Sequence, residues 1–368
     1  GMRVDKHEVR VGELAAGQPL SLPVYRFKGK GAGPSVYIQA NVHGAEVQGN
    51  AVIYQLMKLL EHYELLGDIS LVPLANPLGI NQKSGEFTLG RFDPITGVNW
   101  NREYLDHGFN IEVWYQEHSH LDDDTLITAF RATLVEECAR RLNNPWGVTT
   151  GHRLAVTLQS MAHRADIVLD LHTGPKSCKH LYCPEYERSA AQYFSIPYTL
   201  LIPNSFGGAM DEAAFVPWWT LAEVASSHGR ELGVRVSALT LELGSQERID
   251  LDDALEDAEG ILAYLSHRGV IAETVLPKPM KRYGCFLKNY RKFHAPKAGM
   301  VEYLGKVGVP MKATDPLVNL LRLDLYGTGE ELTVLRLPED GVPILHFASA
   351  SVHQGTELYK VMTKVFEL

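Results

Sequence analysis

Short apolar runs alternate with amphipathic stretches from about residue 34 to 245. This alternation is typical of an α/β domain built on a mostly parallel sheet. The runs predict strands at Ser35–Ala40, Ile69–Leu74, Asp166–Leu171, Tyr198–Ile202 and Val236–Leu241. After the first strand, apolar residues recur at helical spacing at Val52, Leu56, Leu59 and Leu60. We therefore expect a helix from about Ala45 to Tyr63, preceded by a loop at Asn41–Gly44.

The segment Glu103–Ser160 carries acidic and helical stretches, including Leu126–Leu142, and is interpreted as an insertion at the periphery of the sheet. Past about Cys285 the chain changes to short β-rich runs broken by Gly and Pro, with no convincing helix. We expect two domains, a large α/β domain at residues 1–285 and a small β-rich domain at residues 286–368.

A weak internal repeat in the C-terminal part predicts a small pseudo-symmetric β-barrel, similar to the biotinyl/lipoyl carrier fold. Its first copy has Pro296, Gly299, Thr314 and Leu317, and its second has Pro338, Gly341, Gly355 and Leu358. A swinging carrier needs a lysine between the two halves, but none occurs between Lys312 and Lys360. We therefore interpret this domain as structural and unmodified.

Composition narrows the classes of function. With 368 residues and 45% hydrophobic content, the chain is long enough to bury a full core. Its net charge of −9, without a basic cluster, argues against nucleic acid as a partner. No stretch approaches the run of about 18 apolar residues that a membrane span needs. Since no signal peptide is visible either, we expect a cytoplasmic protein with no membrane partner. These features are also compatible with a homo-oligomer.

Two smaller features follow from composition. The cysteines, Cys138, Cys178, Cys183 and Cys285, are too few and too irregularly spaced for a disulfide framework, so we expect buried, reduced thiols. Gly1 precedes Met2, and we interpret it as the remnant of a cleaved expression tag.

Candidate metal ligands lie where two of the predicted strands end. In NVHGAEVQGN, His43 and Glu46 are three positions apart, which brings two side chains to a common side of a turn. In DIVLDLHTG, an apolar strand ends at His172. Two histidines and one carboxylate form the ligand set of a catalytic zinc with an open position for water. Because ligands gather at the carboxyl ends of strands in such sheets, the two fragments are expected to meet around one zinc ion per chain.

A third fragment, ALTLELGSQ, places Glu242 within an apolar strand. An unpaired buried charge costs several kcal/mol, so this carboxylate must be solvated or have a function. Beside zinc-activated water it suits the role of a general base that passes a proton to the leaving amine. In GRFDPITGVNWNREY, Arg102 suits capture of a substrate carboxylate, Arg91 suits stabilisation of the developing oxyanion, and Asn101 adds amide donors. The two arginine roles are interchangeable at this stage.

At these residues the sequence resembles the succinylglutamate desuccinylase/aspartoacylase family of the zinc carboxypeptidase clan. The matching pieces are HGAE, the Asn76–Pro77 pair, the segment ending in NR, DLHTG and the strand bearing Glu242. The resemblance implies hydrolysis of the amide bond of a small N-acyl amino acid. It implies zinc on His43, Glu46 and His172, with Glu242 as the general base. It also implies that Asn101 and Arg102 bind substrate, that Arg91 polarises the carbonyl, and that the C-terminal domain narrows access to the metal.

The resemblance has limits. Members commonly have a small aliphatic residue between the two asparagines, whereas Trp100 separates Asn99 from Asn101 here.

Simpler interpretations remain for single residues. Glu46 could complement the dipole of a first helical turn, and Glu242 could pair with a structural arginine. Arg91 and Arg102 could form surface ion pairs, and Asp170 could support His172 from behind or lie in water.

Three functions therefore compete. The first is a deacylase of N-acyl amino acids. The second is a carboxypeptidase or amidase of the same clan that acts on peptides, which an uncovered metal cleft would favour. The third is a non-catalytic zinc-binding protein, which would bind zinc without turnover. The retention of Glu242, Arg91 and Arg102 argues against the third.

Overall fold

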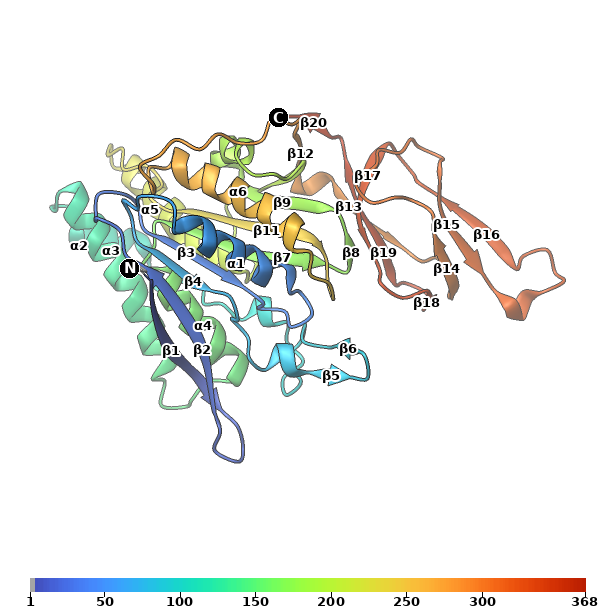
Figure 1. The fold of residues 1–368 in the computed structure, drawn as a ribbon, viewed down its shortest axis with the longest axis horizontal. Helices are drawn as coiled ribbons and strands as arrows, with labels where there is room; N and C mark the ends of the chain where they lie inside the picture. The colour runs from blue at the N-terminus through green and yellow to red at the C-terminus, as the bar shows by residue number, and fades with distance from the viewer. Residues whose placement is uncertain (1–3) are drawn as a thin grey trace.

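The computed structural model describes residues 4–368, so Gly1 and its assigned origin lie outside the described residues. It is built around one ten-stranded sheet (Figure 1). In spatial order the strands are β1 (Val4–Glu13), β2 (Pro19–Phe27), β4 (Ile69–Val72), β3 (Val36–Ala40), β7 (Ile167–Gly174), β11 (Ser237–Ser245), β9 (Lys179–Pro184), β10 (Tyr198–Ile202), β12 (Tyr283–Phe286) and β20 (Phe366–Glu367).

The sheet is mixed and mostly parallel, which confirms the predicted fold class. Strands β3, β4, β7 and β11 run parallel to one another. Strand β9 is antiparallel to β11, and β10 and β12 follow the direction of β9. The carboxyl ends of β3, β7 and β11 therefore meet at one edge, while the predicted strand Tyr198–Ile202 ends at the opposite edge.

Helices cover both faces of the sheet, as the amphipathic stretches predicted. The helices are α1 (Gln48–Leu60), α2 (Ile111–His118), α3 (Asp123–Leu142), α4 (Thr150–Ala162), α5 (Met210–Ser227) and α6 (Leu251–His267). Helices α1 and α6 pack into one apolar core with the strands, and α4 and α5 contribute to the core on the other face. Helices α2 and α3 add an outer cluster beside α5.

Helix α1 buries the apolar positions that predicted it. Val52, Leu56 and Leu60 are fully buried against the sheet, and Leu59 is partly buried. The helix begins at Gln48, three residues later than expected, because the chain first makes a turn. The interpretation of Glu46 as an acidic residue in the first helical turn is therefore wrong.

The segment 103–160 is more than a peripheral insertion. Its helix α4 lies directly on the sheet, where Leu154 and Leu158 share a core with Tyr37 and Val168 of the strands. Helix α3 contacts α4 through Cys138 and Val156, and its residue Phe130 belongs to a separate core cluster with α2 and α5. The expectation of a peripheral position is corrected, because helix α4 packs directly against one face of the sheet.

Several strands were not predicted from sequence. The hairpin β1–β2 lies at the edge of the sheet, and most residues of β1 are exposed, so the strand lacks an apolar run. Strand β9 follows β7 after only the short strand β8 (Lys176–Ser177) and reverses direction. A hairpin of β5 (Lys83–Ser84) and β6 (Phe87–Thr88) lies in the loop after β4. Short 3-10 segments occur at Gly79–Asn81, Trp100–Arg102 and Glu185–Gln192.

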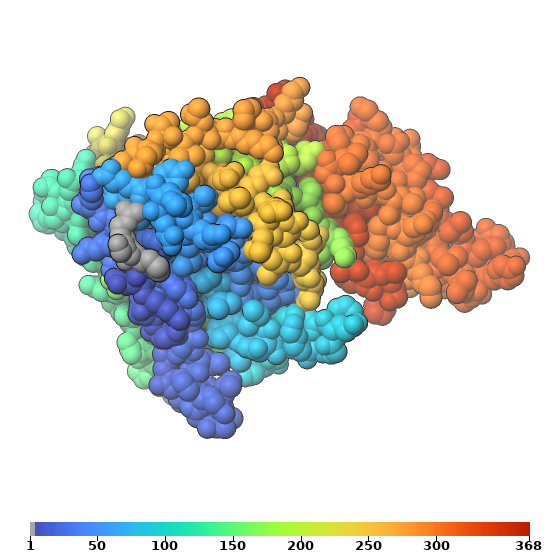
Figure 2. All heavy atoms as spheres, viewed as in Figure 1, coloured from blue at the N-terminus to red at the C-terminus, as the bar shows by residue number. Residues whose placement is uncertain are grey.

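The C-terminal strands form two four-stranded antiparallel sheets, seen as the orange and red lobe in Figure 2. One contains β13 (Tyr290–His294), β19 (Glu357–Thr363), β17 (Gly341–His346) and β8; the other contains β16 (Leu332–Arg336), β15 (Pro316–Leu321), β14 (Gly299–Tyr303) and β18 (Ser351–Val352). The only helical segments among residues 286–368, all of which are described, are 3-10 turns at Leu287–Asn289 and Leu323–Leu325.

Two strand pairings join this lobe to the α/β part. Strand β8, which directly follows β7, pairs with β17, and the final strand β20 pairs with β12 of the large sheet. The lobe is thereby fixed next to the end of β7. All four cysteines are free thiols without a disulfide partner. Within residues 4–368, every helix is too short or too polar to cross a bilayer.

Candidate metal and active site

The loop between β3 and α1 carries the first two candidate ligands. It begins at Asn41, whose φ of 73° is left-handed, a conformation that asparagine tolerates better than most residues. The Asn41 side chain donates to the carbonyls of His43 and Gly44, and the Glu46 N–H donates to the His43 carbonyl at 3.2 Å. This turn directs the side chains of His43 and Glu46 to one side, as their spacing predicted.

The same loop rests on a neighbouring backbone. A Cβ on Gly44 would lie 2.0 Å from the carbonyl oxygen of Gly79, so only glycine fits there. Buried Asn76 donates from Nδ2 to the carbonyl of Val42 at 2.8 Å and accepts from the N–H of Gly79 at 2.9 Å. The Asn76 position therefore serves to hold the ligand-bearing loop.

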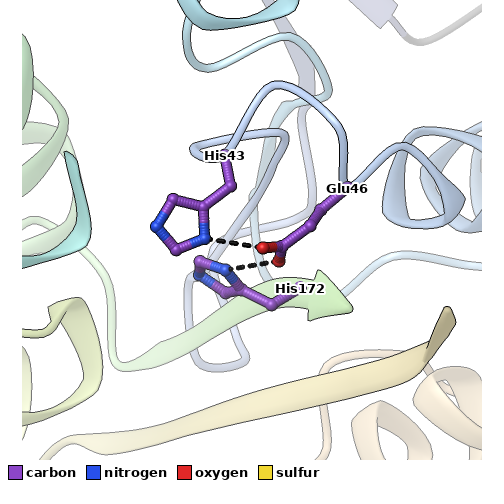
Figure 3. Close-up of side chains that lie close together, drawn as sticks. All are labelled: His43, Glu46 and His172. Atoms are coloured by element: carbon purple, nitrogen blue, oxygen red, sulfur yellow. Dashed lines mark hydrogen bonds and ion pairs between the residues drawn. The ribbon is translucent and has the colours of Figure 1, made fainter. Parts of the chain in front are cut away.

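His43, Glu46 and His172 converge at the carboxyl ends of β3 and β7 (Figure 3). The Nδ1 atoms of His43 and His172 lie 2.7 and 3.2 Å from the two oxygens of Glu46, and the two imidazole centroids are 5.2 Å apart. One potential ligand atom of each residue lies within 4.8 Å of the other two. All three residues are buried, so this cluster of two nitrogens and a carboxylate can hold a metal ion.

The other ring nitrogen of each histidine is bound to a side-chain oxygen. His43 Nε2 lies 2.7 Å from Oδ1 of Asn99, and His172 Nε2 lies 2.8 Å from Oδ2 of Asp170. Because an amide oxygen and a carboxylate oxygen only accept, both Nε2 atoms carry a proton. Both Nδ1 atoms therefore face Glu46. The expectation that Asp170 supports His172 agrees with this contact, whereas the role of Asn99 was missed.

Glu46 is strongly anionic despite its burial. Burial raises its pKa, but His43 and His172 outweigh that effect and hold the pKa well below the usual range. The backbone N–H of Thr173 also donates to Oε1 at 2.8 Å. For His172, burial lowers the pKa, but Asp170 and Glu46 raise it above the usual value. The cluster therefore gathers negative charge that favours a cation.

Glu242 reaches the cluster from the neighbouring strand. It lies beside His172 in the parallel register of β11 and β7. Burial raises the pKa of Glu242 to about 8; Glu46 adds to the rise, while His172 and Arg91 oppose it. Its Oε2 is buried without a hydrogen-bond partner, and no ion pair joins it to an arginine among residues 4–368. A structural arginine pair thus does not explain this carboxylate.

The candidate substrate-binding residues lie on the loop that follows β6. The guanidinium of Arg91 is half exposed, and its Nη1 lies 3.7 Å from Oε2 of Glu46. Asn101 is buried, donates its N–H to Oδ1 of Asn99 and leaves its own Oδ1 unpartnered. Arg102 is exposed, and one guanidinium nitrogen donates to the carbonyl of Asn101 at 2.9 Å. The structure therefore brings Arg91 to the cluster and connects Asn101 to it through Asn99.

Two residues of the C-terminal strands, Tyr290 and Lys360, interact electrostatically with Glu242, and neither was identified from sequence. The ammonium of Lys360 lies 6.0 Å from the ring centroid of Tyr290, whose hydroxyl is buried without a partner. Burial lowers the pKa of Lys360, and the positive charges of Lys292 and Arg91 lower it further. The carboxylates of Glu357 and Glu242 oppose this and raise the pKa. Among the described residues, Lys360 has no carboxylate within ion-pair distance. A lone lysine in a β-rich strand carries no sequence signal for such a position.

Comparisons with known proteins found a matching family model and similar structures. A family model described as the succinylglutamate desuccinylase/aspartoacylase catalytic domain matches residues 32–268. A crystal structure from Shewanella frigidimarina NCIMB 400, described provisionally as a succinylglutamate desuccinylase/aspartoacylase, is 70% identical, with a TM-score of 0.98, and the match covers 100% of this chain and 99% of that one. No curated protein matches the chain.

More distant structures share the fold. A succinylglutamate desuccinylase/aspartoacylase from Rhodobacter sphaeroides is 19% identical, with a TM-score of 0.69, over 98% of this chain and 94% of that chain. The product-bound ectoine utilization protein EutE (DoeB) from Ruegeria pomeroyi is 17% identical, with a TM-score of 0.67, over 97% and 94% of the two chains. At these identities the likeness concerns the fold alone.

Proposed function

Because the chain belongs to the succinylglutamate desuccinylase/aspartoacylase family, we propose that it is a zinc-dependent deacylase of small N-acyl amino acids. Members of this family are deacylases that act on small acyl amino acids. The observation that carries the proposal is the buried convergence of His43, Glu46 and His172, with Glu242 in register on the next strand. The finer steps below follow from the chemistry of these side chains.

The donor set fits zinc. Two neutral imidazole nitrogens and one carboxylate oxygen form a common ligand set of catalytic zinc sites. The Nε2 protons of both histidines are already engaged, so a cation that displaces the Nδ1 protons facing Glu46 would find both Nδ1 lone pairs directed toward it. When bound, zinc supplies Lewis-acid activation of water and of the scissile carbonyl.

Glu242 is the proposed general base. It takes a proton from the attacking water and delivers it to the amine nitrogen as the carbon–nitrogen bond breaks, which yields a carboxylate and an amine. A neighbouring cation favours the charged form of a carboxylate, so metal binding is expected to lower the raised pKa of Glu242. The residue would then be ionised, and able to accept a proton, near neutral pH.

Arg91, Asn101 and Arg102 are proposed to bind the substrate. Arg91 lies next to the cluster and has free donors to stabilise negative charge that develops on the carbonyl oxygen. Arg102 is exposed, and its planar guanidinium suits bidentate capture of a carboxylate. Asn101 adds a buried amide beside it. Of the two arginine assignments left open by the sequence, the 3.7 Å approach of Arg91 to Glu46 favours Arg91 at the reacting carbonyl.

The test is release of free amine from a panel of N-acetyl and N-succinyl amino acids by the zinc-loaded protein, with C-terminally free peptides of two to six residues in parallel. We expect turnover of acyl amino acids to exceed that of peptides. Preferred turnover of peptides would transfer the assignment to a carboxypeptidase. Stoichiometric zinc binding without any turnover would support a non-catalytic zinc protein instead.

A further inference from the structure

A buried chain of hydrogen bonds continues behind His172. Asp170 accepts from His172 through Oδ2 and from the side-chain amide of Gln39 through Oδ1, at 2.8 and 3.0 Å. The amide oxygen of Gln39 accepts from the hydroxyl of Tyr37 at 2.8 Å, and its nitrogen donates to the hydroxyl oxygen of Tyr104 at 3.1 Å. All five side chains are buried, so no bulk water replaces a lost partner.

Asp170 determines how Gln39 is oriented, and the two tyrosines hold it in that orientation. An ionised carboxylate only accepts, so the amide nitrogen of Gln39 faces Asp170, and the amide oxygen then accepts from the hydroxyl of Tyr37. The second N–H of that nitrogen is taken by Tyr104. In the flipped orientation the amide oxygen would face the carboxylate of Asp170, which is repulsive. Gln39 therefore donates a hydrogen bond to one carboxylate oxygen of Asp170, while the second oxygen accepts from the ring of His172.

These residues come from separate parts of the chain. Gln39 and Asp170 lie side by side in the parallel register of β3 and β7. Tyr104 instead follows the loop that carries the candidate substrate residues, and the next residue, Leu105, exchanges two hydrogen bonds with the side chain of Gln159 in α4. The segment 103–160 thus reaches the metal cluster through Tyr104.

We propose that Gln39 and Tyr104 are positioning residues of the metal site. Tyr104 acts through Gln39 and Asp170 to hold His172 with its Nδ1 toward Glu46. This inference rests on the proposed metal function. It gives helix α4 a role, because the docking of α4 sets where the hydroxyl of Tyr104 lies.

The variants Gln39→Met and Tyr104→Phe test this proposal. Each removes the polar contact and keeps nearly the same volume. Zinc affinity is measured by competition with a chromogenic chelator, the cobalt-loaded proteins are compared by their visible absorption spectra, and urea unfolding of the metal-free proteins reports stability. Tyr359→Phe is the matched control, because it removes a buried tyrosine hydroxyl contact, to Gly305, within the C-terminal strands.

Gln39→Met is expected to weaken zinc binding about tenfold and to alter the cobalt spectrum, since partners that orient metal-bound histidines typically act on this scale. Tyr104→Phe should act in the same direction with a smaller effect. The double variant should match Gln39→Met alone, because Tyr104 acts through Gln39. Tyr359→Phe should leave zinc affinity and the cobalt spectrum unchanged.

Zinc affinities and cobalt spectra equal to those of the unchanged protein, in both variants, would overturn the proposal and leave the network with a role in stability only. Additive losses in the double variant would overturn the route through Gln39. If Gln39→Met does not fold, Tyr104→Phe alone decides. Failure of the proposed function is distinguishable, because the unchanged protein would then bind no zinc or release no amine.

Discussion

Asn99 accepts a hydrogen bond from the ring of His43, with 2.7 Å between Oδ1 and Nε2. The same oxygen accepts the backbone N–H of Asn101 at 2.9 Å. One amide group therefore fixes the tautomer of a candidate metal ligand and the conformation of the loop that carries the candidate substrate residues. We therefore expect metal binding and substrate binding to be coupled through this side chain.

Replacement of Asn99 by alanine should weaken zinc binding by about 10- to 100-fold, because His43 loses the acceptor that holds its ring. Asn99→Asp keeps an acceptor oxygen and should bind zinc much more tightly than Asn99→Ala. Chelator competition measures both. Asn81→Ala is the control, since it removes one exposed side-chain contact, to the carbonyl of Pro77. Equal zinc affinities of Asn99→Ala and the control would refute the role of Asn99.

Glu242→Gln should reduce kcat by about 10²- to 10⁴-fold, the usual contribution of a general base, without loss of bound zinc. The amide keeps the size of the side chain but takes no proton at neutral pH. Steady-state amine release and elemental analysis of the same preparation check both statements. Glu302→Gln, on the surface of β14, serves as control. Undiminished kcat in Glu242→Gln would contradict the mechanism.

Lys360→Met should raise KM about tenfold for N-acyl amino acids with an additional carboxylate and should change kcat less. The reason is that Lys360 is a partly buried cation that interacts electrostatically with Glu242 and has no ion-pair partner among the described residues. Lys360→Arg should retain most of the affinity. Lys292→Met, at the exposed cross-strand neighbour, is the matched control. KM values unaffected by Lys360→Met would exclude a contact with substrate.

The free energy of unfolding should decrease as the pH is lowered, because of His163, which lies away from the metal cluster. Burial, with Arg131 adding, lowers its pKa from 6.5 to about 3. Between these pH values His163 is protonated in the unfolded chain but neutral in the folded chain. The free energy of unfolding therefore falls as pH decreases from about 6.5 toward 3. The loss is about 1.4 kcal/mol per pH unit for one proton.

Urea unfolding of chelator-treated protein at pH 7 and pH 5 measures this effect. His163→Gln should show a smaller difference in unfolding free energy between the two pH values than the unchanged protein. His353→Gln, at an exposed position, should show the full difference. An identical pH dependence in His163→Gln and His353→Gln would show that His163 titrates normally.

The sequence determined the central strands, the ligand loop and the main chemical groups. Strands β3, β7 and β11 were predictable because buried strands are continuous apolar runs, and polar residues at their ends are conspicuous. His43 and Glu46 were predictable because a turn brings residues three apart together. Their meeting with His172 followed from the parallel direction of the strands.

The tertiary structure alone decided the partners of those groups. Asn99, Gln39 and Lys360 have ordinary local sequences, and only the tertiary structure places them beside His43, beside Asp170 and within electrostatic reach of Glu242, respectively. The reversed direction of β10 and the packing of α4 on the sheet could not be predicted either. The spacing of hydrophobic residues indicates which positions are buried, but not which strand or helix lies next to them. The raised pKa of Glu242 has the same origin, because desolvation depends on everything packed around a side chain.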